Sequence, residues 1–248
     1  MKLADFDTLT FDCYGTLIDW ETGIAAALEP LAARAGREIA PDERVAAFGH
    51  HEHDEQARTP DARYPEILAA VHAAIARDWG VDPDPGLARA FGASVPAWPA
   101  FADSAKALRY LKRHYRLVIL SNVHRDGFAA SNEKLGVEFD AIYTAEDIGS
   151  YKPDPRNFHH MLDHLARDFG VTRDRILHTA ESLFHDCAMA RSLGLATTWI
   201  HRRAAAGGFG ATRAVEEPPD VDFYFTSLAE MAAAHRKDAA GAGGDGSK

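Results

Sequence analysis

The sequence lacks the features that would indicate a membrane-bound, secreted or nucleic-acid-binding protein. None of its 248 residues lie in an apolar stretch approaching the roughly 20 residues that cross a bilayer, and the N-terminus lacks the apolar run of a secretory signal. Two cysteines, Cys13 and Cys187, are too few for a disulfide framework. The formal net charge of −10 and the scattered basic residues argue against a phosphate-rich partner. We therefore expect a cytoplasmic protein that acts on small solutes, with no nucleic acid or membrane partner, and a homodimer is compatible with these properties.

The spacing of apolar residues predicts an α/β fold built on a parallel sheet. Short apolar runs typical of strands lie at 7–13, 116–120, 141–145, 175–179, 196–200 and 222–226. Segments with helical spacing lie at 104–113, 128–135, 157–169 and 183–193, and another follows the last strand. Strands that alternate with helices are typical of a Rossmann-like core, in which crossover helices cover a parallel sheet.

A long helical insertion separates the first strand from the second. About eighty residues of mainly helical character lie there, with apolar residues at helical spacing in 21–35, 42–56 and 65–78. We predict a helical cap over 18–98 and a core made of 1–17 and 99–238. Residues 239–248 are rich in Gly and Ala, and we expect them to be disordered.

Polar residues follow four of the predicted strands, at the ends where parallel sheets bind their ligands. In chain order, these residues are Asp12, Ser121, Asn122, Lys152, Glu181 and Asp186. Each one alone has an ordinary explanation as a turn former, a solvated Lys or an acid at a helix start. Because the carboxyl ends of parallel strands meet at one edge, their convergence predicts a functional site.

The segments that hold these residues resemble the four motifs of the haloacid dehalogenase superfamily. Residues 10–20 (TFDCYGTLIDW) resemble the first motif and 120–122 (LSN) the second. Residues 150–155 (SYKPDP) resemble the third and 178–194 (HTAESLFHDCAMARSLG) the fourth. The motifs occur in the family's order over nearly the whole chain. The resemblance implies a Rossmann-like core, an inserted cap and a hydrolase.

Tyr14 departs from the phosphatases of that superfamily, which carry a second Asp there, near a Mg²⁺ site. Tyr is a poor ligand for a hard cation, so the usual oxygen cage would be incomplete and phosphoryl transfer would lose its main electrostatic support. The Asp-X-Tyr-Gly-Thr signature instead resembles the metal-independent 2-haloacid dehalogenases. In that branch an Asp displaces a leaving group from C2 of a short carboxylic acid, and water hydrolyses the resulting ester. We therefore expect no metal and no cofactor.

The resemblance also implies a role for each site residue. Asp12 is the nucleophile, and Lys152 keeps it ionised. Asp186 orients or deprotonates the water that hydrolyses the ester. Ser121 holds the substrate carboxylate, together with backbone N–H groups that follow Asp12. Asn122 and Tyr14 line the side of the leaving group.

Three positions depart from the haloacid enzymes and disfavour a halide-accepting pocket. Phe158 replaces an aromatic hydroxyl, Leu183 replaces an Asn and Glu181 replaces a small Ser. No counterpart of the cap Arg is evident, because the corresponding stretch 48–53 (FGHHEH) offers histidines. A carboxylate at Glu181 would repel a departing halide but would stabilise a cationic amine, so we expect this residue to bind the substrate; the alternative is a salt bridge to Lys152.

Longer segments resemble the azetidine-2-carboxylate hydrolases of the same branch, which open a strained imino acid ring. Examples are LGVEFD (135–140), GFGAT (208–212) and PDVDFYF (219–225). The expected substrate is therefore L-azetidine-2-carboxylate, and the alternative is an (S)-2-haloacid. A Mg²⁺-dependent phosphatase is less favoured, and a non-catalytic binding protein is the remaining class.

Overall fold

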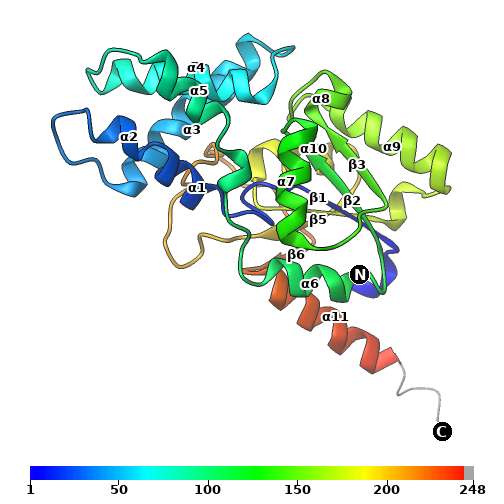
Figure 1. The fold of residues 1–248 in the computed structure, drawn as a ribbon. Coiled ribbons are helices and arrows are strands. Elements are labelled where there is room, and N and C mark those ends of the chain that lie inside the picture. Colours follow the sequence, from blue (N-terminus) through cyan, green and yellow to red (C-terminus); the bar gives the residue numbers. More distant parts are fainter. Residues whose placement is uncertain (243–248) are drawn as a thin grey trace, which may run out of the picture.

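A six-stranded parallel sheet forms the centre of the computed structural model, which describes residues 1–242 (Figure 1). The strands are β1 (Thr8–Phe11), β2 (Arg116–Ser121), β3 (Ala141–Thr144), β4 (Ile176–Ala180), β5 (Ala196–Ile200) and β6 (Phe223–Phe225). They are arranged in the order β3-β2-β1-β4-β5-β6, and every neighbouring pair is parallel. The central strand β1 therefore lies between β2 and β4, which confirms the predicted Rossmann-like α/β class.

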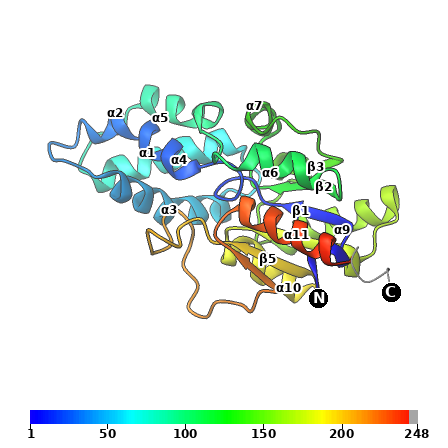
Figure 2. The same cartoon turned by 90° about the horizontal axis from the view of Figure 1, so that it is seen from below.

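Helices cover both faces of the sheet (Figure 2). They are α6 (Ser104–Leu111), α7 (Arg125–Leu135), α8 (Ala145–Ile148), α9 (Pro155–Phe169), α10 (Ala188–Ser192) and α11 (Leu228–Ala242). Side chains of β2 alternate between the two layers, because successive residues of a strand point to opposite faces. Leu117 and Ile119 pack in the core that includes α6, α7 and α11, whereas Val118 and Leu120 pack with α9 and α10.

Five helices between β1 and α6 form a block to one side of the sheet (Figure 1). They are α1 (Trp20–Ala27), α2 (Glu29–Ala32), α3 (Pro41–Arg58), α4 (Tyr64–Asp78) and α5 (Pro85–Gly92). The chain enters and leaves this helical block along adjacent segments: the Asp19 N–H donates to the Pro99 carbonyl (2.8 Å), and the Phe101 N–H donates to the Leu17 carbonyl (3.1 Å). The block occupies the stretch in which the sequence predicts a cap.

The remaining turns are short. They are the 3₁₀ turns η1 (Leu3–Asp5), η2 (Val95–Ala97) and η3 (Arg173–Arg175) and the π-helical turn η4 (Leu183–Cys187). The helix predicted at 183–193 thus begins as a π turn before α10. In that turn the Cys187 N–H donates to the Ser182 carbonyl five residues back (3.1 Å). No helix within residues 1–242 combines the length and apolar character needed to cross a bilayer.

Two other predicted segments differ from the structure. The helix expected at 21–35 is divided into α1 and α2 at Leu28, and Pro30 in the first turn of α2 has no N–H to continue an unbroken helix. The predicted disordered tail is wrong for 239–242, which continue α11, because three of these four residues are Ala, the best helix former. Residues 243–248 lie outside the described part.

Candidate active site

Lys152 lies at the centre of a buried charged network at the carboxyl ends of the strands. Its Nζ donates to Asp12 Oδ1 (2.9 Å), Asp186 Oδ1 (2.6 Å) and the Leu120 carbonyl (2.9 Å). All three protons of the ammonium are therefore used. The Lys152 side chain is 2% exposed, so water contributes little to its solvation. Two carboxylates share this one cation, which leaves the network with a net negative charge.

Neighbouring side chains fix both carboxylates. Thr16 Oγ1 donates to Asp12 Oδ2 (3.0 Å). His178 lies in the buried strand β4, where its Nε2 contacts Asp186 Oδ1 (3.0 Å) and its Nδ1 contacts Thr10 Oγ1 (2.8 Å). Because an ionised carboxylate can only accept, His178 Nε2 carries a proton. The sequence prediction missed His178, although a histidine within an apolar strand was a signal for it.

The pKa values of the two carboxylates shift in opposite directions, and His178 contacts Asp186 but not Asp12. Burial raises the pKa of Asp186, but the charge of Lys152 and the His178 hydrogen bond outweigh this and lower it to about 2. For Asp12, burial prevails over the opposing charge of Lys152, and the pKa is raised. Burial lowers the pKa of Lys152, and the two carboxylates outweigh it, so that the pKa is raised. Lys152 and His178 both hold the Asp186 carboxylate as a hydrogen-bond acceptor, so it is suited to orient water.

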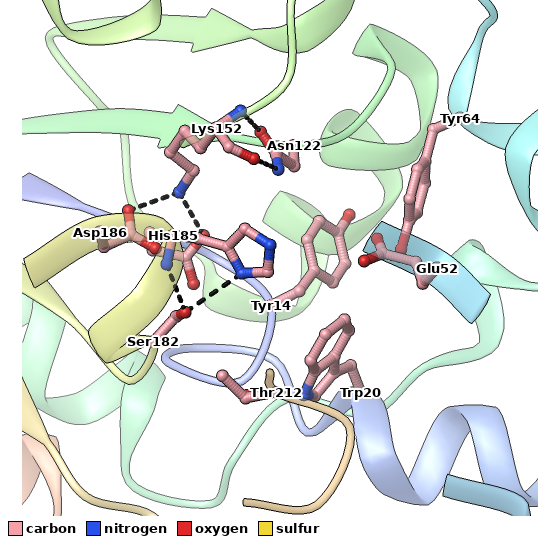
Figure 3. A pocket seen from close by; sticks show the side chains of 11 residues that line it. Tyr14, Trp20, Glu52, Tyr64, Asn122, Lys152, Ser182, His185, Asp186 and Thr212 are labelled. Atoms are coloured by element: carbon pink, nitrogen blue, oxygen red, sulfur yellow. Dashed lines mark hydrogen bonds and ion pairs between the residues drawn. The ribbon is translucent and has the colours of Figure 1, made fainter. Parts of the chain in front are cut away.

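A pocket lies between this network and the helical block (Figure 3). It is narrow, with a cavity volume of about 30 Å³. The lining residues are Asp12, Tyr14, Trp20, Glu52, Tyr64, Asn122, Lys152, Ser182, His185, Asp186 and Thr212. The structure thus brings together five of the seven residues that the sequence predicts for the site, namely Asp12, Tyr14, Asn122, Lys152 and Asp186.

The other two predicted residues, Ser121 and Glu181, do not line this pocket. Ser121 is the last residue of β2, and its buried hydroxyl has no hydrogen-bond partner within residues 1–242. The Glu181 carboxylate accepts from Thr212 Oγ1 (2.7 Å), and Glu181 lines a second cavity, which shares Trp20 with this pocket. Its backbone is held by Trp199, whose Nε1 donates to the Glu181 carbonyl (2.8 Å). The structure therefore does not place Glu181 beside the leaving group, and it shows no contact with Lys152.

Glu52 of α3 is the carboxylate that the helical block contributes to the pocket. Its side chain is 5% exposed, and Gln56 Nε2 donates to it. Burial raises the pKa of Glu52 to about 7, against the hydrogen bond from Tyr64. The sequence prediction missed this residue, although Val45, Phe48, Glu52 and Gln56 share one buried stripe at helical spacing. An acid in such a stripe was the available signal.

The histidines of 48–53 do not face this pocket. His51 Nε2 pairs with Asp78 Oδ2 (2.6 Å), and His50 and His53 line a different cavity. Phe158 packs its ring against His178, with 5.0 Å between ring centroids, and is fully buried in the core. Within 48–53, the residue that lines the pocket is therefore the acid Glu52, and not a counterpart of the cap Arg.

The residues at the strand ends do not fit a Mg²⁺ cage. The hydroxyl of Tyr14 hydrogen-bonds to Ser131 Oγ (2.9 Å), and its ring meets Trp98 edge to face. The ammonium of Lys152 lies between the carboxylates of Asp12 and Asp186, where a cation would bridge them. Within residues 1–242, no three His, Cys, Asp or Glu side chains are grouped to hold a metal ion.

Comparison with known proteins places this geometry in a family. Residues 6–194 match the model of the haloacid dehalogenase-like hydrolases. An enzyme of Burkholderia cepacia named (S)-2-haloacid dehalogenase 4A is 25% identical over 221 residues, which cover 86% of this chain and 85% of that protein.

Two solved structures share the fold. A defluorinating L-2-haloacid dehalogenase has a TM-score of 0.74 at 21% identity, covering 95% of this chain and 98% of that one. The L-2-haloacid dehalogenase of Xanthobacter autotrophicus, with chloropropionic acid covalently bound, has a TM-score of 0.73 at 20% identity, covering 93% and 98%. The family match extends over most of the chain and includes Asp12, Lys152 and Asp186, so this protein belongs to the haloacid dehalogenase-like hydrolases and is a hydrolase.

Proposed function

We propose that this hydrolase displaces a ring amine from C2 of a small imino acid through an ester on Asp12, without a metal, and that L-azetidine-2-carboxylate is its preferred substrate. The charge of the pocket carries this proposal. Asp12, Glu52 and Asp186 face the cavity, and Lys152 is the one Lys or Arg among its lining residues within the described chain. Such a pocket stabilises a cationic leaving group and repels a departing anion.

In the first step, a carboxylate oxygen of Asp12 attacks C2 of the substrate. The C2–O bond forms while the C2–N bond breaks, and the electron pair stays on the nitrogen. Relief of the four-membered ring drives the opening. The ring nitrogen is protonated in the bound substrate, so it leaves as a neutral primary amine, takes a proton from Glu52 and remains beside the resulting carboxylate as an ammonium. Glu52 can donate a proton and can also stabilise the ammonium, because with a pKa of about 7 it is either protonated or charged near neutral pH.

In the second step, water attacks the carboxyl carbon of Asp12 in the ester. Asp186 accepts a hydrogen bond from this water and orients it, and Lys152 stabilises the negative charge that forms on the Asp12 oxygen. The ester C–O bond breaks at the carboxyl carbon, the alkoxide oxygen takes a proton, and Asp12 is restored with one oxygen from water. For L-azetidine-2-carboxylate the product is 4-amino-2-hydroxybutyrate.

An (S)-2-haloacid is the second candidate, supported by the activity named for the similar proteins. A departing halide needs donors or positive charge close to C2. Here the ammonium of Lys152 is already occupied by three acceptors, and Glu52 lies across the pocket. The charge of this pocket therefore favours the amine.

The proposal is tested by a substrate panel assayed with and without EDTA. The panel contains L-azetidine-2-carboxylate, (S)-2-chloropropionate and p-nitrophenyl phosphate, and Asp12→Asn is the control for background hydrolysis. We expect the imino acid to be turned over fastest, equally with and without EDTA. Turnover of (S)-2-chloropropionate alone would show that the leaving group is a halide and not an amine. Mg²⁺-dependent phosphate release would refute reaction at carbon.

A further inference from the structure

We propose that His185 holds the carboxylate of the substrate through its Nε2–H. This rests on the proposed function in one respect, namely that the ligand is a small carboxylic acid. His185 lies in the π turn η4, directly before Asp186, and it lines the pocket. His185 is 9% exposed, so each polar atom of its side chain needs a hydrogen-bond partner from the protein or from a ligand.

Ser182 determines which ring nitrogen of His185 carries the proton. Its Oγ accepts from the His185 backbone N–H (2.9 Å) and lies 3.2 Å from His185 Nδ1. The hydroxyl proton of Ser182 has no other acceptor within the described residues, so it is donated to Nδ1. The neutral ring then carries its own proton on Nε2.

That Nε2 is buried and has no hydrogen-bond partner within residues 1–242. Figure 3 shows the ring of His185 with one nitrogen bonded to Ser182 and the other turned away from it, toward the space beside Tyr14. A buried donor without an acceptor is destabilising. The geometry therefore indicates an acceptor that arrives with the ligand.

Most other donors of the pocket are already engaged. Lys152 has no proton left, as described above. The amide nitrogen of Asn122 donates to the Lys152 carbonyl (3.0 Å) and to Gln56 Oε1 (3.4 Å). The hydroxyls of Tyr14 and Thr212 are paired as well. Trp20 turns its indole N–H toward Thr212, at the edge of the pocket (Figure 3).

Three acidic side chains line this pocket, so the substrate carboxylate needs a hydrogen-bond donor that carries no negative charge. Burial lowers the pKa of His185 to about 3, and the imidazole therefore stays a neutral donor at physiological pH. His185 and Glu52 would hold opposite ends of an amino acid, the carboxylate at the first and the nitrogen at the second. The backbone N–H of Tyr14, which also lines the pocket, donates to no backbone acceptor within residues 1–242.

Binding of two half-substrates tests this assignment without turnover. Cyclobutanecarboxylate keeps the carboxylate, and azetidine keeps the amine; their Kd values are measured by calorimetry for wild type, His185→Phe, His185→Gln and Ser182→Ala. We expect His185→Phe to weaken cyclobutanecarboxylate binding by roughly 10- to 100-fold, as for one lost hydrogen bond to a charged group. His185→Gln restores an N–H near Nε2 and should recover most of the affinity. Azetidine binding should be unchanged throughout.

His53→Phe is the matched control, because its ring packs 5.6 Å from that of His185 but does not line this pocket. Equal loss of both half-substrates in His185→Phe, or no loss of cyclobutanecarboxylate, overturns the proposal. If His185→Phe melts well below wild type, His185→Gln and Ser182→Ala provide the test instead. The proposal is then overturned if Ser182→Ala binds cyclobutanecarboxylate with full affinity while His185→Gln does not bind it. If wild type binds cyclobutanecarboxylate through His185 but does not open L-azetidine-2-carboxylate, the proposed substrate fails and this inference stands.

Discussion

Asp186 and Glu52, which lie on opposite walls of the pocket, are buried carboxylates whose pKa values shift in opposite directions. On the wall formed by the strand ends, Asp186 contacts the Lys152 ammonium at 2.6 Å, and its pKa falls to about 2. On the wall formed by the helical block, Glu52 contacts the neutral side chains of Gln56 and Tyr64, and burial raises its pKa to about 7. Burial raises the pKa of all three acids, and the shift is reversed at Asp186, where the His178 hydrogen bond adds to the charge of Lys152, but not at Asp12. We infer that the first wall supplies fixed charges for ester chemistry and the second adapts the pocket to its substrate.

The largest effect should come from the strand-end wall. Asp12→Asn removes the nucleophile and should reduce kcat/KM by roughly 10⁴-fold or more, as for other covalent catalysts. In the wild type under multiple turnover in H₂¹⁸O, mass spectrometry of the peptide that contains Asp12 should show ¹⁸O in this side chain. Label that appears in the product of a single turnover, with Asp12 unlabelled, would mean that water attacks C2 directly.

Glu52→Gln should have the next largest effect and separates the two walls. It removes the negative charge but keeps the side-chain shape, so kcat/KM for L-azetidine-2-carboxylate should fall by roughly 10²-fold, the scale of one electrostatic contact in catalysis. Turnover of (S)-2-chloropropionate should hold steady or rise. Glu55→Gln is the matched control, because Glu55 is also buried on α3 but does not line the pocket. An equal loss with both substrates would show that Glu52 serves the fold and not the leaving amine.

Glu181 is a buried acid outside the pocket, and Glu181→Gln tests whether its raised pKa affects the stability of the fold. Burial raises the pKa of Glu181 from 4.5 to about 8. The folded state therefore favours the protonated acid, and the stability of the wild type should fall as pH rises from about 4.5 to about 8. The variant lacks this loss, so its free energy of unfolding should exceed that of wild type by on the order of 1–3 kcal/mol at pH 9 and differ little at pH 4.

Urea unfolding at the two pH values measures this difference. Turnover of L-azetidine-2-carboxylate by Glu181→Gln should stay within roughly threefold of wild type, because Glu181 lines the second cavity and not the pocket that holds Asp12. A hundredfold loss of activity with unchanged stability would instead return Glu181 to the substrate site.

The smallest effect should come from metal removal. The ammonium of Lys152 already lies between Asp12 and Asp186, and the Tyr14 hydroxyl is paired with Ser131. EDTA, and Mg²⁺ added after it, should each change kcat/KM by less than about twofold, since the donors for a hard cation are incomplete. Activity that disappears in EDTA and returns with Mg²⁺ would show that the strand-end wall is a metal site.

Much of the strand-end wall could be predicted from the sequence, because its geometry follows from local rules. Parallel strands bring their carboxyl ends to one edge, so residues directly after apolar runs must converge there. Asp12 and Asn122 follow their strands by one residue, and Lys152 enters on the next crossover. The six-stranded parallel sheet and the helical insertion after β1 follow from the same periodicity.

Only the tertiary structure decided which other polar side chains face the pocket. Glu181 was expected to face the substrate, but its backbone is tied to Thr16 and Trp199, and it lines another cavity. Glu52 lies over 130 residues before Asp186, and it meets the site only because α3 packs over the strand ends. The direction of a side chain in a loop or on an inserted helix depends on contacts distant in sequence. Strand periodicity therefore determined where the charges of Asp12, Lys152 and Asp186 gather, and long-range packing determined which acid faces them.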